Sequence, residues 1–149
     1  MSSALRISEA TSLAMHTMAM LAHGDNGGMT SKDIASVLSV SQAHLQKVLQ
    51  RLGHSGLVRS ERGPKGGFTL ARSPERITLL EVYESIEGPL HLGDCLLGRA
   101  TCARENCVLG GLVASVNGQF SEYLRETTLA DLAPVGSAGA AGKTKGDER

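Results

Sequence analysis

Three cysteines that stand close together have the most distinctive chemistry in this sequence. Cys95, Cys102 and Cys107 lie within thirteen residues in the order Cys-x6-Cys-x4-Cys, and the chain has no other cysteine. Thiolates are soft anionic ligands that suit iron–sulfur clusters and also bind zinc. Arg99 and Arg104 flank the second cysteine and would stabilise thiolates. The spacing therefore leaves three interpretations open: an iron–sulfur cluster, a zinc site or a thiol switch.

A second group of polar side chains falls on one face of a predicted helix over residues 42–54, opposite a face of regularly spaced apolar residues. Gln can pair with adenine, whereas Lys and Arg can reach guanine or phosphate. The candidate DNA-contacting residues on this face are Gln42, His44, Gln46, Lys47, Gln50 and Arg51. Thr30, Ser31 and Ser41 stand at predicted helix starts, where their hydroxyls can hold phosphates.

A basic β-hairpin is predicted directly after this helix. Residues 57–61 and 68–71 have strand character, and the turn between them, Arg62-Gly63-Pro64-Lys65-Gly66-Gly67, is rich in Gly and Pro. Such a hairpin can enter a minor groove or follow the DNA backbone, and its glycines allow close approach to phosphate. Its candidate DNA-contacting residues are Arg59, Arg62, Gly63, Lys65 and Gly66. The alternative is an ordinary solvated hairpin.

Helices must position both groups of side chains. The pattern predicts helices over 8–23, from the Thr30–Asp33 capping box onward, over 42–54, and from a second capping box, Thr78–Glu81, to residue 87. The second and third form a helix-turn-helix. A long helix over 108–126 follows, with an apolar seam that favours homodimerisation or, alternatively, packing on its own core. The expected fold is mainly α with a small β-hairpin wing: a winged helix-turn-helix followed by a long C-terminal dimerisation helix.

The charge distribution agrees with a polyanion partner for the first half of the chain. The net charge of the 149 residues is zero, but residues 28–76 contain eight Lys or Arg against three Asp or Glu, and residues 77–133 contain three against eight. No apolar run is long enough to cross a membrane and no secretion signal is evident, so we expect a cytoplasmic protein. The chain shows no nucleophile–base pair and no phosphate loop between strand and helix, so an enzyme is not expected.

Four regions follow from these features. Residues 1–89 are the expected DNA-binding domain, residues 90–107 a loop that bears the cysteines, and residues 108–133 the dimerisation helix. Residues 134–149 are small, polar and rich in Gly, Ala and Lys, which predicts a disordered tail.

The order of these elements resembles the Rrf-type family of winged-helix regulators, which includes IscR-, NsrR-, RirA- and CymR-like members. The resemblance covers residues 7–132. It rests on Leu45-Gln46-Lys47-Val48-Leu49, on Gly56-Leu57-Val58, on the hairpin turn with Phe68 after it, on Ile77-Thr78-Leu79-Leu80-Glu81-Val82 and on Glu87-Gly88-Pro89-Leu90.

The resemblance implies a homodimer on a palindromic DNA operator, with the long helices crossing between subunits. In the cluster-binding branch, three cysteines of one subunit hold a [2Fe–2S] or [4Fe–4S] cluster, which here implies Cys95, Cys102 and Cys107 as metal ligands. Many members have the spacing Cys-x5-Cys-x5-Cys, so the middle cysteine of this chain, Cys102, is displaced by one residue.

At the positions where family members supply a fourth ligand to the cluster, this chain has other residues. IscR-like members use a His where this chain has Gly110, and NsrR-like members use an Asp where it has Ser12. Glu9 and His16 lie one turn away from Ser12 on the same helix face and are further candidates, and Asp94 and Glu105 are local alternatives.

The function that these observations predict is a DNA-binding repressor that senses redox or iron–sulfur status through the cluster. One alternative is a regulator of the same fold without a cluster, acting as a thiol switch or as a sensor of a ligand or protein partner. An alternative of another class is an iron–sulfur electron carrier or cluster-delivery protein.

Overall fold

Helix α1 (Glu9–His23) lies at the centre of a bundle of helices and contacts α2, α3, α4 and the hairpin. The computed structural model describes residues 7–24, 27–64, 66–93, 108–109 and 111–135. Ser8 caps the helix, because its hydroxyl accepts the Thr11 N–H at 3.1 Å. Met18 is fully buried and Met20 nearly so. These methionines therefore fill the core of a chain that has no Trp and few aromatic residues.

Helices α2 (Ser31–Leu38) and α3 (Gln42–His54) form the predicted helix-turn-helix. Three residues join them, and Ser39 takes the left-handed conformation that ends α2. The capping box predicted at Thr30 is half formed. The Thr30 hydroxyl accepts the Asp33 N–H, but the Asp33 carboxylate accepts from that hydroxyl at 2.6 Å. The apolar side of α3 is buried through Leu45, Val48, Leu49 and Leu52.

Strands β1 (Val58–Glu61) and β2 (Gly67–Leu70) form the predicted antiparallel hairpin, in a register that pairs Val58 with Leu70 and Glu61 with Gly67. Met29, in the segment before α2, pairs with Phe68 through two backbone hydrogen bonds of 2.8 and 3.0 Å. This bridge attaches the hairpin to the segment that leads into the helix-turn-helix.

Helix α4 (Leu79–Glu87) follows a 3-10 turn, η1 (Pro74–Arg76), and its predicted capping box is complete. The Thr78 hydroxyl accepts the Glu81 N–H, and the Glu81 carboxylate accepts the Thr78 N–H at 3.0 Å. Arg72 donates to the same carboxylate at 2.6 Å. Thr78 also pairs with Thr128 in a short antiparallel bridge, which holds the start of α4 against the segment after α5.

Helix α5 (Leu112–Glu126) begins four residues later than the sequence pattern predicts. Val108 and Leu109 form a turn, the Leu112 N–H bonds to the Leu109 carbonyl, and Gly111 caps the helix. A glycine at this position explains the late start, because glycine is a poor residue for the interior of a helix. A second 3-10 turn, η3 (Leu129–Asp131), follows α5.

The apolar seam predicted on α5 divides between two environments. Val113 and Leu124 are buried, and Phe120 packs edge-to-face on Tyr83 of α4 with ring centroids 5.8 Å apart. Leu112, in contrast, is 58% exposed. Part of the predicted dimerisation seam therefore belongs to the core of the same chain.

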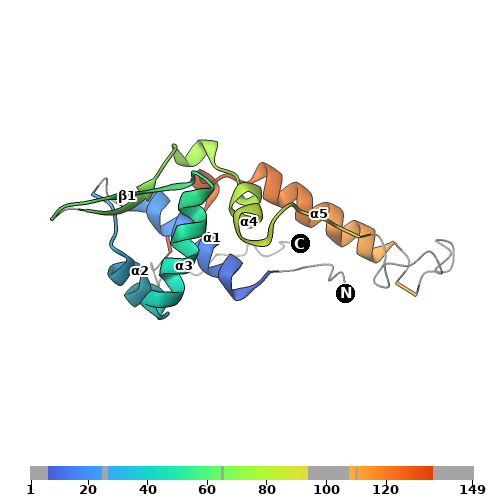
Figure 1. Cartoon of the computed structure of the whole chain (residues 1–149). Coiled ribbons are helices and arrows are strands. Elements are labelled where there is room, and N and C mark those ends of the chain that lie inside the picture. Colours follow the sequence, from blue (N-terminus) through green and yellow to red (C-terminus); the bar gives the residue numbers. More distant parts are fainter. Residues whose placement is uncertain (1–6, 25–26, 65, 94–107, 110, 136–149) are drawn as a thin grey trace, which may run out of the picture.

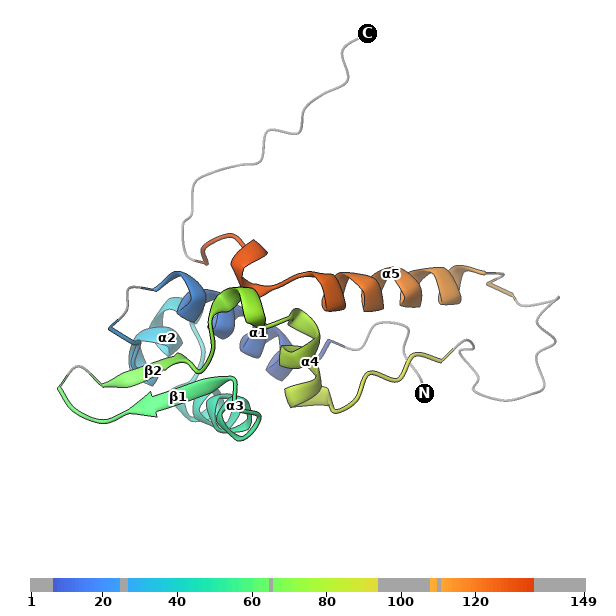
Figure 2. The ribbon, with the colours of Figure 1, turned by 90° about the horizontal axis from the view of Figure 1, so that it is seen from above.

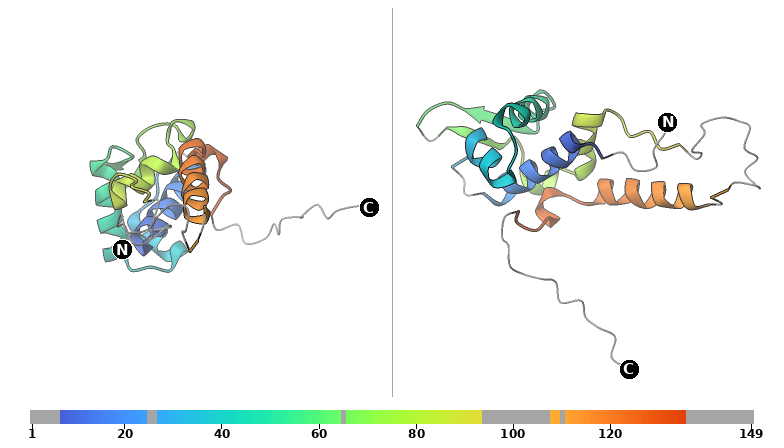
Figure 3. Two further views of the ribbon diagram at one scale, coloured as in Figure 1. Left: turned by 90° about the vertical axis from the view of Figure 1, so that its right-hand side faces the viewer. Right: turned by 90° about the horizontal axis from the view of Figure 1, so that it is seen from below.

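The hairpin and α5 project from opposite ends of the bundle (Figure 1). Seen from above, α3 and α5 lie on opposite sides of the bundle, and the first turns of α5 extend beyond the other helices (Figure 2). The end-on view agrees with this arrangement (Figure 3). Within the described residues, none of the helices is long and apolar enough to cross a membrane.

Candidate nucleic-acid interface and cysteine segment

The outward face of α3 is polar and open to solvent. Gln46, Lys47 and Gln50 are exposed, and no described residue bonds to their side chains. His44 is half-buried, and its Nδ1 lies 3.9 Å from a Glu9 carboxylate oxygen. This face can present amide and ammonium groups to a groove of DNA without first breaking a contact within the protein.

The beginning of α3 is held to the beginning of α2. Gln42 Nε2 donates to the Ser31 hydroxyl at 3.0 Å, and the Ser41 hydroxyl accepts the His44 N–H at 3.1 Å. Thr30 caps α2 at the same end of the motif. The candidate phosphate-contacting hydroxyls therefore lie at two adjacent helix N-termini, where backbone N–H groups and the helix dipole favour anions.

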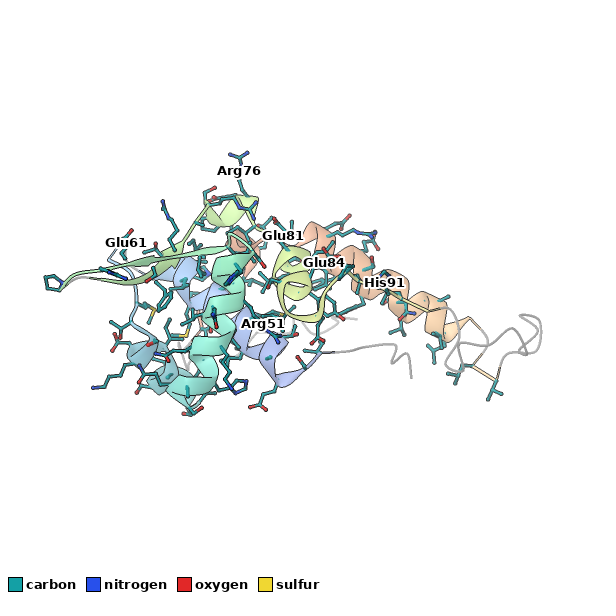
Figure 4. All side chains as sticks on the ribbon, viewed as in Figure 1. Arg51, Glu61, Arg76, Glu81, Glu84 and His91 are labelled. Atoms are coloured by element: carbon teal, nitrogen blue, oxygen red, sulfur yellow. The ribbon has the colours of Figure 1, made fainter. Side chains whose placement is uncertain are left out.

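Arg51 lies apart from the start of α3 and contacts helix α4. Its Nη1 donates to the carbonyl of Ile86 at 3.3 Å. Figure 4 shows Arg51 on the part of α3 that faces the end of α4. A cation at the carbonyl end of a helix interacts favourably with its dipole. Arg51 thus has a role in holding α3 to α4, besides the DNA contact predicted for it.

The two faces of the hairpin have different surroundings. Val58 and Ser60 line a depression together with Leu49 and His54 of α3. Arg59 alternates with them and lines a separate cavity against the end of α1. The structure therefore places Arg59 on the side of the hairpin that is turned away from α3.

The turn of the hairpin is closed by glycines. The Gly66 N–H bonds to the Gly63 carbonyl at 2.8 Å, and a Cβ on Gly66 would lie 2.4 Å from the Glu61 carbonyl oxygen. Only glycine fits there, so the close packing of the turn backbone explains why a glycine stands at this position. Arg62 is exposed, whereas Lys65, the other predicted cation of the turn, lies outside the described residues.

The candidate fourth ligands on α1 occupy one accessible face. Glu9 and His16 are exposed, Ser12 is half-buried, and His16 Nδ1 lies 2.7 Å from the Ser12 carbonyl oxygen. The cysteines and the local alternatives Asp94 and Glu105 lie outside the described residues. Within the described part of the chain, no group of three His, Cys, Asp or Glu side chains could hold a metal ion.

Two residues that the sequence analysis missed hold the flanks of the cysteine segment. Asn117 is 5% exposed on α5, and its Nδ2 donates to the Gly93 carbonyl at 2.8 Å. Glu87, the last residue of α4, accepts the Ser8 N–H at 3.2 Å and the Thr11 hydroxyl. Asn117 could have been found from the sequence, because it is an Asn within an otherwise apolar stripe of a predicted helix. Glu87 showed no such signal, because its partners are more than 70 residues away.

The clearest electrostatic perturbation lies at the start of α4. Burial raises the pKa of Glu81, but the Thr78 N–H and the Arg72 guanidinium together lower it more. Its pKa therefore lies below the ordinary value of 4.5. The carboxylate stays charged and stabilises the joint between the hairpin and α4.

A helix-turn-helix with an exposed polar second helix, followed at once by a hairpin with a glycine-closed turn, defines a winged-helix DNA-binding protein. Comparison with known proteins identifies the family. Residues 7–134 match the family model Rrf2, described as an iron-dependent transcriptional regulator. The chain belongs to the Rrf2 family of transcriptional regulators.

Individual relatives agree. YwgB of Bacillus subtilis, whose name places it among HTH-type transcriptional regulators, is 36% identical over 103 residues, which are 68% of this chain and 66% of YwgB. The transcriptional regulator NsrR of Bacillus licheniformis is 32% identical over 124 residues, or 80% of this chain and 84% of the relative. The solved structure of CymR, the global cysteine regulator of B. subtilis, superimposes with a TM-score of 0.71 at 28% identity and covers 85% of this chain and 95% of that one.

These findings confirm the family and the winged-helix fold inferred from the sequence. The chain is a transcriptional regulator and its relatives are not enzymes. The alternative of an electron carrier or cluster-delivery protein has no support among them.

Proposed function

We propose that this regulator is a homodimeric repressor that binds a palindromic operator in the cytoplasm, and that Cys95, Cys102 and Cys107 hold an iron–sulfur cluster whose state controls DNA binding. The observation that supports DNA recognition most strongly is the open polar face of α3 beside the glycine-closed hairpin. The family's description as iron-dependent supports the cluster.

In the proposed complex, α3 enters the major groove. Gln42 and Gln46 read base edges, and Lys47 contacts phosphate. The remaining proposed contacts are Thr30, Ser31, Ser41, His44, Gln50, Arg51, Arg62, Gly63, Lys65 and Gly66. Of these, Thr30, Ser31 and Ser41 lie at the two helix N-termini and Arg62, Gly63 and Gly66 in the turn of the hairpin, whereas Gln50 and Arg51 lie further along α3.

The exposed part of α5 supports the proposed homodimer. Leu112 and Tyr123 are both 58% exposed, and Val108, in the turn before the helix, is 97% exposed. Leu112, Val116 and Tyr123 follow the helical repeat along one side of α5, distinct from the side that packs on α4. A second copy of this helix would bury that apolar side, as the crossing helices implied by the family resemblance would do.

The donor chemistry fits an iron–sulfur cluster, because three thiolates within a short segment are the ligands that such clusters require. A bound cluster would supply redox-active iron. The protein's contribution is to fix the ends of the segment, through Asn117 at Gly93 on one side and through the start of α5 on the other. Glu9, Ser12 and His16 are the proposed source of a fourth ligand from α1.

Purification without oxygen, followed by iron and sulfide analysis and a visible spectrum, tests the cluster. We expect iron, sulfide and charge-transfer absorption together, and DNA affinity that differs between the loaded and the cluster-free protein. Protein that holds neither iron nor sulfide after reconstitution would overturn the cluster and leave DNA binding intact.

The likeness to the cysteine regulator CymR favours a second candidate, a regulator without a cluster in which the same cysteines act as a thiol switch. In that case metal-free protein should bind the operator, and mild oxidation should change its affinity reversibly. Substitution of all three cysteines by Ser should remove the response while preserving DNA binding.

A further inference from the structure

A cavity of about 300 Å³ lies under the hairpin, on the side away from α3. Its walls come from the last turns of α1, from the segment before α2, from both strands and from Pro74 at the start of η1. The Met29–Phe68 bridge joins two of these walls. The volume is at the lower end of the range of small-molecule sites, so the cavity suits a small ligand rather than a drug-sized one.

Charges of opposite sign line this cavity. Arg59 and Glu61 are alternate residues of β1, so both project from the same face of the hairpin. Neither side chain forms an ion pair or hydrogen bond with another described residue. Thr69, opposite Arg59 on β2, also lines the cavity, and its buried hydroxyl oxygen has no partner among the described residues. A guanidinium and a carboxylate are therefore both available to a ligand.

The rest of the lining is apolar. Leu21, Ala22 and Met29 all contribute to it, and each is only partly buried against the hydrophobic core. Small-molecule sites combine apolar side chains with a few convergent polar groups, and this cavity has both.

We propose that this cavity binds a zwitterion of amino-acid size with an apolar side chain. Arg59 binds its carboxylate, Glu61 binds its ammonium group, and the apolar wall of Leu21 and Met29 receives its side chain. A guanidinium matches a carboxylate in geometry as well as in charge. A ligand with only one charge would leave either Arg59 or Glu61 without a partner.

The same arrangement is unsuited to the DNA backbone. Glu61 lies on the same face as Arg59, and a carboxylate repels phosphate. The face is also turned away from the exposed side of α3. We therefore assign Arg59 to this site, in place of the DNA contact that the sequence predicts. A bound ligand would contact both α1 and the hairpin, and would thus restrict the position of the hairpin relative to the bundle.

Isothermal titration of the full chain with L-leucine, L-methionine and L-phenylalanine tests the proposal. We expect at least one to bind with a dissociation constant of about 1 μM to 1 mM. Its N-acetyl derivative lacks the ammonium group and its amide lacks the carboxylate, so each should bind about tenfold more weakly or worse. Arg59→Gln should weaken binding of the parent amino acid by a similar factor, so that the parent no longer binds more tightly than its amide. Glu61→Gln should likewise leave the parent binding no more tightly than the N-acetyl form.

Glu75→Gln and Arg76→Gln are matched controls, because both residues are exposed on η1 outside the cavity, and Arg76 points away from the bundle (Figure 4). They should leave binding unchanged. The proposal is overturned if none of the three amino acids binds at about 10 mM, if both derivatives bind as tightly as the parent, or if Arg59→Gln and Glu61→Gln have no effect. The titration contains neither DNA nor iron, so its failure is distinct from failure of operator or cluster binding.

Discussion

Gln46 offers the sharpest test of base recognition, because no residue in the described part of the chain bonds to its amide. The side chain is exposed on α3 and forms no hydrogen bond with a described residue. Gln46→Ala should therefore change the free energy of unfolding by no more than about 0.5 kcal/mol. Any decrease in DNA binding can then be assigned to the interface.

The expected magnitude follows from the pair of hydrogen bonds that Gln makes with adenine. A bidentate pair of this kind discriminates against the wrong base by about 1–3 kcal/mol, which corresponds to roughly 5- to 150-fold in affinity for each half-site. Gln46 is uncharged, so its removal should leave affinity for unrelated DNA unchanged. The ratio of operator affinity to non-specific affinity should fall by the full factor.

The assay is fluorescence anisotropy with an operator selected from random duplexes and with a scrambled duplex, each at several salt concentrations. Lys47→Ala is the matched control, because Lys47 is the next residue and its side chain is likewise exposed and unbonded among the described residues. Lys47→Ala should weaken binding to both duplexes alike. It should also lower the slope of log affinity against log salt concentration by about 0.9 for each phosphate that the protein no longer neutralises. If Gln46→Ala left the specificity ratio intact, or if it weakened both duplexes equally, direct base reading by Gln46 would be refuted.

Four further predictions concern the fold, the dimer and the cysteines. Thr78→Ala should lower the free energy of unfolding by about 1 kcal/mol through removal of the α4 cap, with Thr78→Ser nearly neutral in urea denaturation. The pKa of Glu81 is lowered in the folded state, so its contribution is complete above pH 4.5 and declines as the pH falls through the folded pKa. The stability difference between wild type and Glu81→Gln should therefore shrink on acidification, and a difference independent of pH would contradict this. Leu112→Asp should give monomers in light scattering, whereas Ala114→Asp, exposed on another side of α5, should not; dimers in both would contradict the proposed interface. Cys102→Ser should lose most iron and sulfide after reconstitution, and full retention would exclude Cys102 as a ligand.

Features that depend on neighbouring residues could be predicted from the sequence. Ser8, Ser41 and the Thr78–Glu81 box all cap their helices as expected, because a cap joins residues only three apart. The hairpin was predictable for the same reason, since its Gly-Pro turn is local. Its strands shift by only about one residue from the predicted bounds.

Features that depend on distant residues could not be predicted. The Met29–Phe68 and Thr78–Thr128 bridges join segments 39 and 50 residues apart, which no local pattern reveals. The division of the α5 seam likewise depends on where α4 lies, because periodicity gives the apolar side of a helix but not the element that covers it. The side of the hairpin on which Arg59 lies is fixed by strand register and by the position of α1.

The last turn of α4 lies between the cysteine-bearing segment of the chain and α3, the helix that we propose enters the major groove. Arg51 of α3 donates to the Ile86 carbonyl, and the adjacent Glu87 accepts from Ser8 and Thr11 at the start of α1. Cys95 follows Glu87 by only eight residues. A displacement of this turn would therefore act directly on α3 and on the start of α1, without rearrangement of the buried core. Since packed cores resist continuous deformation, a hydrogen-bonded helix end of this kind is the physically easier path for the regulatory change that the proposed function requires.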